Sequence, residues 1–275
     1  MTASINTNIG AMIALQNLNS ITADLRKTQN RISTGLKVAS AKDDGATYAI
    51  AQSQRAKVSS LDAVKDSLSR TSSVVDVAMN AGESISDLLT QLKEKALAAS
   101  DTSLDTTSRR ALQSDFNAIR DQITKTASNA SFNGINLLDG SRANIAALAD
   151  ASGTSHMTVG AQNMSLGGSI VTLGATASFA TATSAQALLT TLDSSINNVS
   201  SALSSLGSNS KALDLHSTFI GKLQDTLTAS IGNLVDADMA TESARLQALQ
   251  TKEQLAVQSL SIANQSQSFL LNLFK

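Results

Sequence analysis

Apolar residues recur at every seventh position through the second half of the chain, from residue 192 to residue 234. The members of this run are Leu192, Val199, Leu206, Leu213, Ile220, Leu227 and Leu234. A heptad register held over this many repeats is typical of a helix that packs along one seam, as in a coiled coil. The pattern therefore predicts a continuous helix over 192–234, about 65 Å long at roughly 1.5 Å per residue.

A second long helix is predicted in the first half, from Lys42 to about Ser100. Its apolar residues, at spacings of three and four, include Leu61, Val64, Leu68, Val75, Ala78, Ala81, Ile85, Leu88 and Leu92. The polar segment "DTSLDTTSRR" follows, and its Asp, Ser and Thr residues are of the kind that cap helices. We expect a shorter helix next, with Phe116 and Ile123 on its apolar face, before two Asn/Gly turns in "SFNGINLLDG".

Residues 141–185 have a different character from the helical regions on either side. Glycines interrupt short alternating runs, and charged residues are few. This composition is typical of a small β-containing or irregular element. We therefore expect an insertion here between the two long helices.

Both ends of the chain carry an apolar stripe with a three–four alternation. The N-terminal stripe is Ala11, Ala14, Leu18, Ile21, Leu25, Thr28 and Ile32, and the C-terminal stripe is Leu246, Leu249, Ala256, Leu260, Ala263, Leu270 and Phe274. A second C-terminal line, Leu255, Ile262 and Phe269, makes the final helix too widely apolar for a two-stranded pairing. We expect other copies of the same chain to cover the remainder, because a few exposed large side chains forfeit several kcal/mol at roughly 25 cal/mol per Å².

The composition argues against several classes of partner and chemistry. The net charge is −1 with 16% charged residues, so no basic field is available to hold nucleic acid or an anionic membrane. The absence of cysteine excludes disulfides and thiolate chemistry, and the absence of proline leaves long helices without forced kinks. No Lys or Arg precedes the apolar stretch 9–18, and no stretch approaches the roughly 18 residues of a membrane span. Neither a cleavable export signal nor a membrane anchor is therefore expected.

Candidate catalytic and metal-binding residues are few. His156 and His216 have no second histidine at a ligand spacing, which favours a structural role for each. The pairs Asp43–Asp44 and Asp236/Asp238 lie where helices are expected to begin, so we interpret them as helix caps rather than as acid–base or metal groups. The sequence predicts no catalytic residue, no metal site and no cofactor.

Four long motifs resemble the terminal signatures of bacterial flagellins, and in particular the compact flagellins of alphaproteobacteria. They are "SINTNIGAMIALQNLN", "QNRISTGLKVASAKDDGATYAIA", "TASNASFNGINLLDG" and "IGNLVDADMATESARLQALQTKEQLAVQSLSIANQSQSFLLNLFK". The resemblance implies a mainly α fold of long paired helices, with a terminal coiled coil (D0), a helical rod (D1) and a small β-hairpin or irregular outer element.

The resemblance also implies boundaries along the chain. It divides the chain into 1–41 (N-terminal D0 helix and spoke), 42–140 (N-terminal D1 helices and turn), 141–186 (outer insertion), 187–235 (C-terminal D1 helix) and 236–275 (C-terminal D0 helix). The spokes that join the two layers would be 33–44 and 232–241, and a β-hairpin would lie near 132–159.

The function implied by the resemblance is a structural one. The chain would be a non-enzymatic subunit of the extracellular flagellar filament, secreted unfolded, with other flagellin subunits, the export apparatus, an export chaperone and the filament cap as partners. The alternatives are a non-filament protein of a secretion apparatus and a hook–filament junction protein. The self-assembly residues would be Ile5, Ile9, Leu18, Ile21, Leu25, Ile32, Leu255, Leu260, Ile262, Phe269, Leu270, Leu273 and Phe274.

Two further expectations concern the outer surface. Flagellins sensed by the vertebrate innate flagellin receptor present an arginine, a leucine and a glutamate where this chain has Gln91, Lys95 and Asp115. We therefore expect weak or absent receptor signalling. Because many relatives carry O-linked glycans, the hydroxyls of the insertion are candidate modification sites: Thr154, Ser155, Thr158, Ser165, Thr172, Thr176, Ser178, Thr181 and Thr183.

Overall fold

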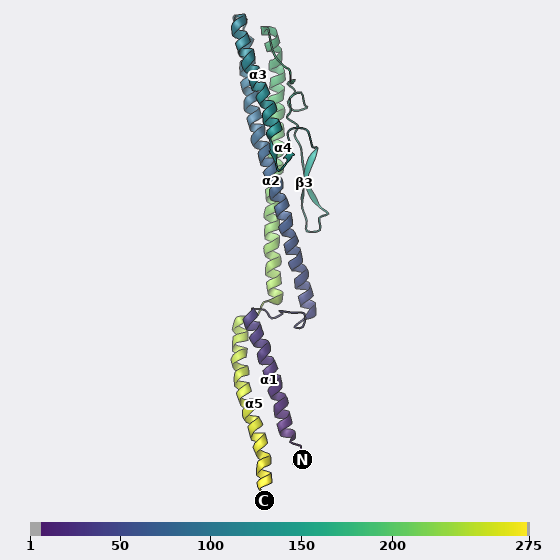
Figure 1. Cartoon of the computed structure of the whole chain (residues 1–275), viewed down its shortest axis with the longest axis vertical. Helices are drawn as coiled ribbons and strands as arrows, with labels where there is room; N and C mark the ends of the chain where they lie inside the picture. The colour runs from purple at the N-terminus through teal and green to yellow at the C-terminus, as the bar shows by residue number, and fades with distance from the viewer. Residues whose placement is uncertain (1–6, 274–275) are drawn as a thin grey trace. The chain divides into compact units, whose positions relative to one another are not determined.

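The structure is a computed structural model that describes residues 7–273, with side chains through residue 265. Its elements in chain order are α1 (Ile9–Thr34), α2 (Gly45–Ala99), α3 (Thr106–Asn129), β1 (Ser131–Phe132), β2 (Ile135–Asn136), β3 (Asn144–Leu148), β4 (His156–Gly160), α4 (Ala182–Val235) and α5 (Met239–Leu273) (Figure 1). The chain divides into two compact units: residues 1–56 with 226–275, and residues 57–225. The mainly α fold with a small β element is confirmed.

In the first unit, α1 and α5 pack side by side (Figure 1). The helix α1 begins at Asn8, whose side chain accepts a hydrogen bond from the Ala11 N–H at 2.9 Å and donates one to the Ala263 carbonyl at 2.9 Å. It ends at Gly35, whose φ of 72° lies in the left-handed region that favours glycine. The sequence thus fixes both ends of α1, and Asn8 also ties its start to α5.

The two connecting segments of this unit pair with each other through their backbones. The Lys37 N–H donates to the Val235 carbonyl at 2.7 Å, and the Ala237 N–H donates to the Gly35 carbonyl at 2.8 Å. The second connection is much shorter than the 232–241 segment expected, because α4 continues to Val235 and α5 begins at Met239. The α-helical hydrogen bonds of α4 therefore take up most of the predicted spoke.

The aspartates at these connections confirm the capping interpretation for two of the four. Asp44 accepts hydrogen bonds from the Ala46 and Thr47 N–H groups at the start of α2, and Asp238 does the same for Ala240 and Thr241 at the start of α5. The hydroxyl of Thr47, three residues on, also donates to Asp44 and holds the pKa of that carboxyl below its ordinary value. These carboxylates are thus occupied by helix ends.

The second unit is built on α2, α3 and α4. The predicted heptad positions on α4 are fully buried from Leu192 to Ile220, whereas Leu227 and Leu234 are only half-buried. Beyond residue 226 the helix belongs to the first unit, and its buried positions move to Ile231 and Val235. The apolar pattern is continuous along α4, but the buried positions change where the helix passes from the second unit to the first.

The insertion packs against the helices instead of forming a loose surface loop. Its apolar residues Met164, Val171, Leu173 and Phe179 are buried, and the Phe179 ring packs edge-on against Phe116 of α3 with centroids 5.1 Å apart. Two separate antiparallel pairs, β1–β2 and β3–β4, replace the single hairpin expected near 132–159. The first pair turns tightly at Asn133 and Gly134, both with positive φ, as its "NG" sequence predicts.

Gly82 of α2 lies at a close approach of three segments. A Cβ on this glycine would lie 2.8 Å from the Leu203 Cδ2 of α4 and 3.3 Å from the Met164 Cε of the insertion. The absence of a side chain at this interior helical position is therefore explained by close packing of three segments.

Candidate functional site: the terminal helix pair

The predicted self-assembly residues fall into two sets once α1 and α5 are packed. Leu25 is buried, and Leu18, Ile21, Ile32 and Leu260 are half-buried. Ile9, Leu255 and Ile262 instead remain about 60% exposed, at 63%, 58% and 62%. The first set is covered wholly or in part when the helices pack, and the second set is left on the surface.

The remaining predicted positions receive no structural test. Ile5 and Phe274 lie outside the described residues. Phe269, Leu270 and Leu273 belong to the last turns of α5, but their side chains lie outside the described part of the chain. Their role in assembly therefore stays a prediction.

Exposed apolar residues that the sequence reasoning missed enlarge the surface. These residues are Met12, Ile13, Leu15 and Val257. The signal was present in the sequence, because Ile9 and Ile13 lie one helical turn apart on a line beside the stripe at Ala11, Ala14 and Leu18. We call the exposed residues on the groove side of the pair the terminal apolar face: Ile9, Met12, Ile13, Leu255 and Ile262. Leu15 and Val257 lie about 200° around their helices from Ile13 and Leu255, so they are exposed on the opposite sides.

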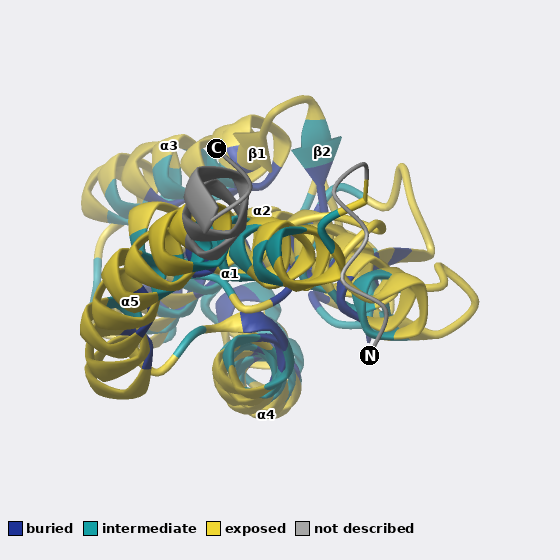
Figure 2. Cartoon of the chain, turned by 90° about the horizontal axis from the view of Figure 1, so that it is seen from below, coloured by how far each residue is buried: buried dark blue, intermediate teal, exposed yellow. Residues whose placement is uncertain are grey.

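A groove of about 550 Å³ runs between α1 and α5 within this face. Its walls combine small residues, such as Gly10 and Ala256, with the large side chains of Ile13 and Leu255. Figure 2 shows exposed residues spread around α5, with burial confined to a few positions such as Leu249. Small residues beside large exposed ones form a surface into which another helix packs.

One ion pair lies inside the helix pair itself. The Arg31 Nη1 of α1 and the Glu242 Oε1 of α5 are 2.7 Å apart, and the Glu242 side chain is only 9% exposed. The Arg31 Nε and the Glu242 Oε2 are buried and have no hydrogen-bond partner among the described residues. A buried pair of this kind is costly to break on one side, and such pairs can set the register between helices.

Neither histidine takes part in a catalytic arrangement among the described residues. The His216 Nε2 lies 2.8 Å from the Ala149 carbonyl oxygen, and its ring lies beside Phe219. His156 is exposed on β4. Within residues 7–273, no group of three or more His, Asp or Glu side chains is placed to hold a metal ion. No helix in the described part of the chain has the length and apolarity needed to cross a membrane.

The β3–β4 loop contains the most strongly perturbed carboxyl group. The Ser152 hydroxyl, 2.6 Å from the Asp150 Oδ2, lowers the pKa of Asp150 to about 2, with help from the Ser155 and Thr154 N–H groups. Because the folded pKa lies below the ordinary value of 3.8, this carboxylate stabilises the loop fully above about pH 4. Its contribution is lost as the pH falls toward 2.

We therefore expect an NMR titration of Asp150 to give a pKa near 2, and order in the β3–β4 loop to fall between about pH 4 and pH 2. In Asp150→Asn, which cannot ionise, amide exchange in this loop should be faster at pH 7 and should not respond to acid. A normal titration near the ordinary value of 3.8 would contradict this account of the loop.

The described surfaces define a class of protein: a mainly helical subunit whose paired terminal helices leave large apolar side chains exposed. Family models for the bacterial flagellin N-terminal helical region and the bacterial flagellin C-terminal helical region match residues 5–143 and 189–274. The chain belongs to the bacterial flagellin family. It is a flagellar filament subunit of the alphaproteobacterial type.

Individual relatives agree with this assignment. The chain is 56% identical to the flagellin FljM of Caulobacter vibrioides over 99% of its own length and 98% of that protein. It is 35% identical to a flagellin of Brucella melitensis, with 99% of both chains covered. A putative flagellar hook-associated protein from Vibrio parahaemolyticus shares the fold, with a TM-score of 0.60 at 14% identity, over 70% of this chain and all of that one.

Proposed function

We propose that the terminal apolar face is the surface through which copies of this chain join into the filament. The observation that supports it is the exposure of Ile9, Leu255 and Ile262 on helices that are already paired. About 60% of each such side chain remains to be covered, and its burial by a neighbour yields about 1–2 kcal/mol, so several of them together stabilise a polymer. A contact between two different surfaces of the chain repeats from copy to copy and produces a helix.

Electron microscopy of the purified chain tests this proposal. The wild-type chain should form smooth helical filaments above a critical concentration, while dilution below it should leave monomers. Amide hydrogen exchange in α1 and α5 should slow greatly on polymerisation, because the helices gain cover on their exposed sides. Chains that stay monomeric at all concentrations, or filaments whose α1 and α5 exchange as fast as in the monomer, would refute it.

We propose that the D0 and D1 layers of the family correspond to the terminal helix pair and to the helices of residues 57–225. On this proposal the subunit leaves the cell unfolded through the flagellar export apparatus, with a chaperone before export and the filament cap after it. The absence of cysteine supports passage through an oxidising environment without cross-linking. Cells without a functional export gate should retain the chain, and its appearance outside such cells would refute this route.

The role is structural and no catalytic step is proposed. The putative flagellar hook-associated protein from Vibrio parahaemolyticus shares the fold of this chain, so the fold alone does not separate a filament subunit from a junction protein. The full-length identity to several flagellins favours the filament subunit over a junction protein. A filament subunit should assemble by itself into long filaments, whereas a junction protein should not.

We also propose that this subunit signals weakly through the vertebrate flagellin receptor. The Lys95 Nζ of α2 lies 2.8 Å from the Asp115 Oδ2 of α3. The lysine thus replaces an apolar contact and at the same time neutralises the acid that the receptor would meet. Gln91, one turn before Lys95, is exposed and carries no charge for the receptor to pair with.

The triple variant Gln91→Arg/Lys95→Leu/Asp115→Glu should restore reporter-cell signalling. We expect a gain of roughly 30-fold or more in potency, since a restored arginine hot spot is worth at least about 2 kcal/mol. Thr90→Arg, which adds the same charge one position away, is the matched control and should leave the signal low. Full potency of the unmodified monomer would contradict the proposal.

We propose O-glycosylation of the insertion at hydroxyls that have no partner among the described residues. Of the nine candidates, Ser165 is half-buried, and the hydroxyls of Thr154, Thr172, Ser178 and Thr181 already form hydrogen bonds. The exposed and unpaired hydroxyls are those of Ser155, Thr158, Thr176 and Thr183. The intact mass of the subunit from native filaments should exceed the mass calculated for the unmodified chain. A measured mass equal to that of the unmodified chain would refute this proposal.

A further inference from the structure

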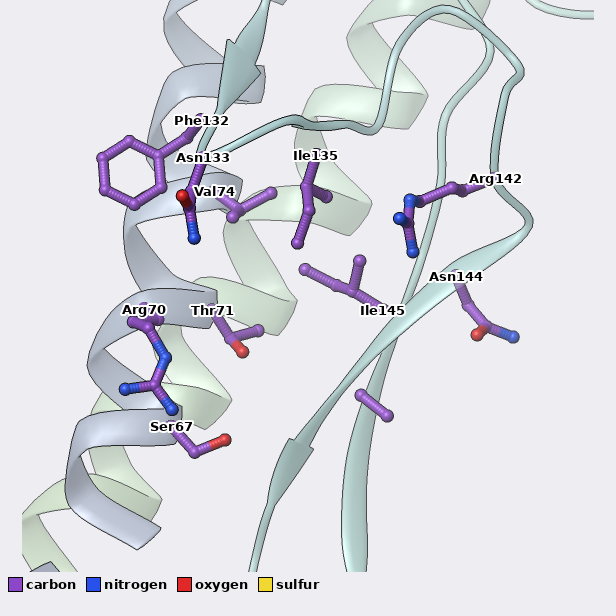
Figure 3. Close-up of a pocket in the computed structure, with 11 residues that line it drawn as sticks. Ser67, Arg70, Thr71, Val74, Phe132, Asn133, Ile135, Arg142, Asn144 and Ile145 are labelled. Carbon is purple, nitrogen blue, oxygen red and sulfur yellow. The ribbon is translucent and has the colours of Figure 1, made fainter. Parts of the chain in front are cut away.

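A second groove lies in the unit of residues 57–225, between α2 and the β-strand region (Figure 3). Its volume is about 370 Å³. Arg70 of α2 and Arg142, just before β3, lie on opposite sides of it, and Phe132 of β1 lines its edge. We call it the arginine groove.

The groove has an unbalanced positive charge. No acidic residue lines it, and neither arginine forms an ion pair or hydrogen bond with any described residue. Phe132, which is 39% exposed, adds an apolar side chain to the lining of the same groove. Such a surface favours a partner that carries carboxylates, because arginine binds carboxylates through two parallel hydrogen bonds.

A complementary surface exists on the same chain. Asp76, Glu83, Asp87 and Glu94 are spaced by seven, four and seven residues along α2, so their side chains form one stripe about 27 Å long. All four are exposed, and none has an ion pair or hydrogen bond among the described residues. We call this set the carboxylate stripe.

The stripe and the arginine groove lie on different sides of α2. At roughly 100° per residue, Arg70, Thr71 and Val74 are about 120–180° around the helix from the stripe. One neighbouring copy therefore cannot contact both the arginine groove and the carboxylate stripe of a given copy. Two different neighbours are needed, which makes the contact heterologous and able to continue without closing.

We propose that the arginine groove of one copy binds the carboxylate stripe of a second copy, with Glu83 and Asp87 meeting Arg70 and Arg142. Glu83 and Asp87 are one helical turn apart at the centre of the stripe, so both project toward the same partner surface. This inference rests on the proposed polymerisation, and it adds a polar contact outside the terminal helices. Its electrostatic complementarity sets the register between neighbouring copies.

Charge reversal on either side tests the pairing. Arg70→Glu/Arg142→Glu and Glu83→Arg/Asp87→Arg should each raise the critical concentration for assembly at least tenfold, because like charges then face each other. Both variants change exposed residues, and circular dichroism of the monomers checks that their helices are intact. The matched control Arg110→Glu/Lys125→Glu makes the same change of charge on α3, where both residues are exposed and unpaired, and it should assemble as wild type does.

An equal mixture of the two reversed variants gives the decisive test. The acidic groove of the first variant matches the basic stripe of the second, and the unchanged groove of the second matches the unchanged stripe of the first. The mixture should therefore assemble at a concentration at which each variant by itself stays monomeric. Wild-type assembly by either single variant, an equal defect in the control, or a mixture that stays monomeric would overturn the pairing. Failure of the wild-type chain to polymerise would instead refute the proposed function, so the two failures are distinguishable.

Discussion

Leu255→Asp is expected to raise the critical concentration for filament assembly by about 100-fold or more. The leucine is 58% exposed in the packed helix pair and lines the groove between α1 and α5. Burial of its exposed part by a neighbour is worth about 1–2 kcal/mol, and a carboxylate placed there must also lose its hydration at a cost of at least about 1–2 kcal/mol more. At about 1.4 kcal/mol per tenfold change, the sum reaches two orders of magnitude.

The same substitution should leave the monomer almost unchanged, because the side chain is largely in water before assembly. Sedimentation of the chain at a series of concentrations measures the effect, and monomer circular dichroism supplies the reference. Leu255→Met is the matched control, since it keeps the apolar volume, and it should assemble within a fewfold of wild type. If Leu255→Asp assembled normally, the terminal apolar face would not be an assembly surface.

Arg31→Ala is expected to destabilise the α1–α5 pair by about 3–5 kcal/mol, because it leaves the Glu242 carboxylate buried without its partner. Glu242→Ala should cost less, since the Arg31 side chain is 23% exposed and retains some contact with water, against 9% for Glu242. The double variant Arg31→Met/Glu242→Leu removes both charges and keeps apolar volume, so it should lie close to wild type.

Amide exchange of residues 25–34 and 239–249 in assembled filaments measures this difference. Exchange should be fastest in Arg31→Ala and near the wild-type rate in the double variant. The heat or denaturant needed to depolymerise the filaments should follow the same order. Equal exchange in all four proteins would mean that the ion pair contributes nothing to the helix pair.

Elements with a strong local period were predicted well, because the period is a property of the chain alone. The heptads from Leu192 to Ile220 lie buried on α4, and α2 differs from its predicted bounds by only a few residues. Local caps and turns could also be predicted, because each depends on neighbours within a few residues. They are the caps at Asp44 and Asp238 and the turn at Asn133–Gly134.

Features that join distant parts of the chain could not be predicted from the sequence. The residues of the Arg31–Glu242 pair are separated by 211 positions, and nothing in either local pattern selects the other. The insertion was expected to be a surface element, yet Phe179 packs on Phe116 across the unit. The arginine groove likewise joins Arg70 to Arg142 from segments whose meeting depends on the packing of the strands against α2.

The sequence by itself determined the long helices, the caps at Asp44 and Asp238 and the excess of apolar surface on the terminal helices, because periodicity and capping act over one or two turns. The tertiary structure decided which apolar residues remain exposed and which charges stay unpaired. The exposure of a side chain and the pairing of a charge depend on which residues of other elements pack against it. Those residues are set only by the packing of α1 on α5 and of the strands on α2.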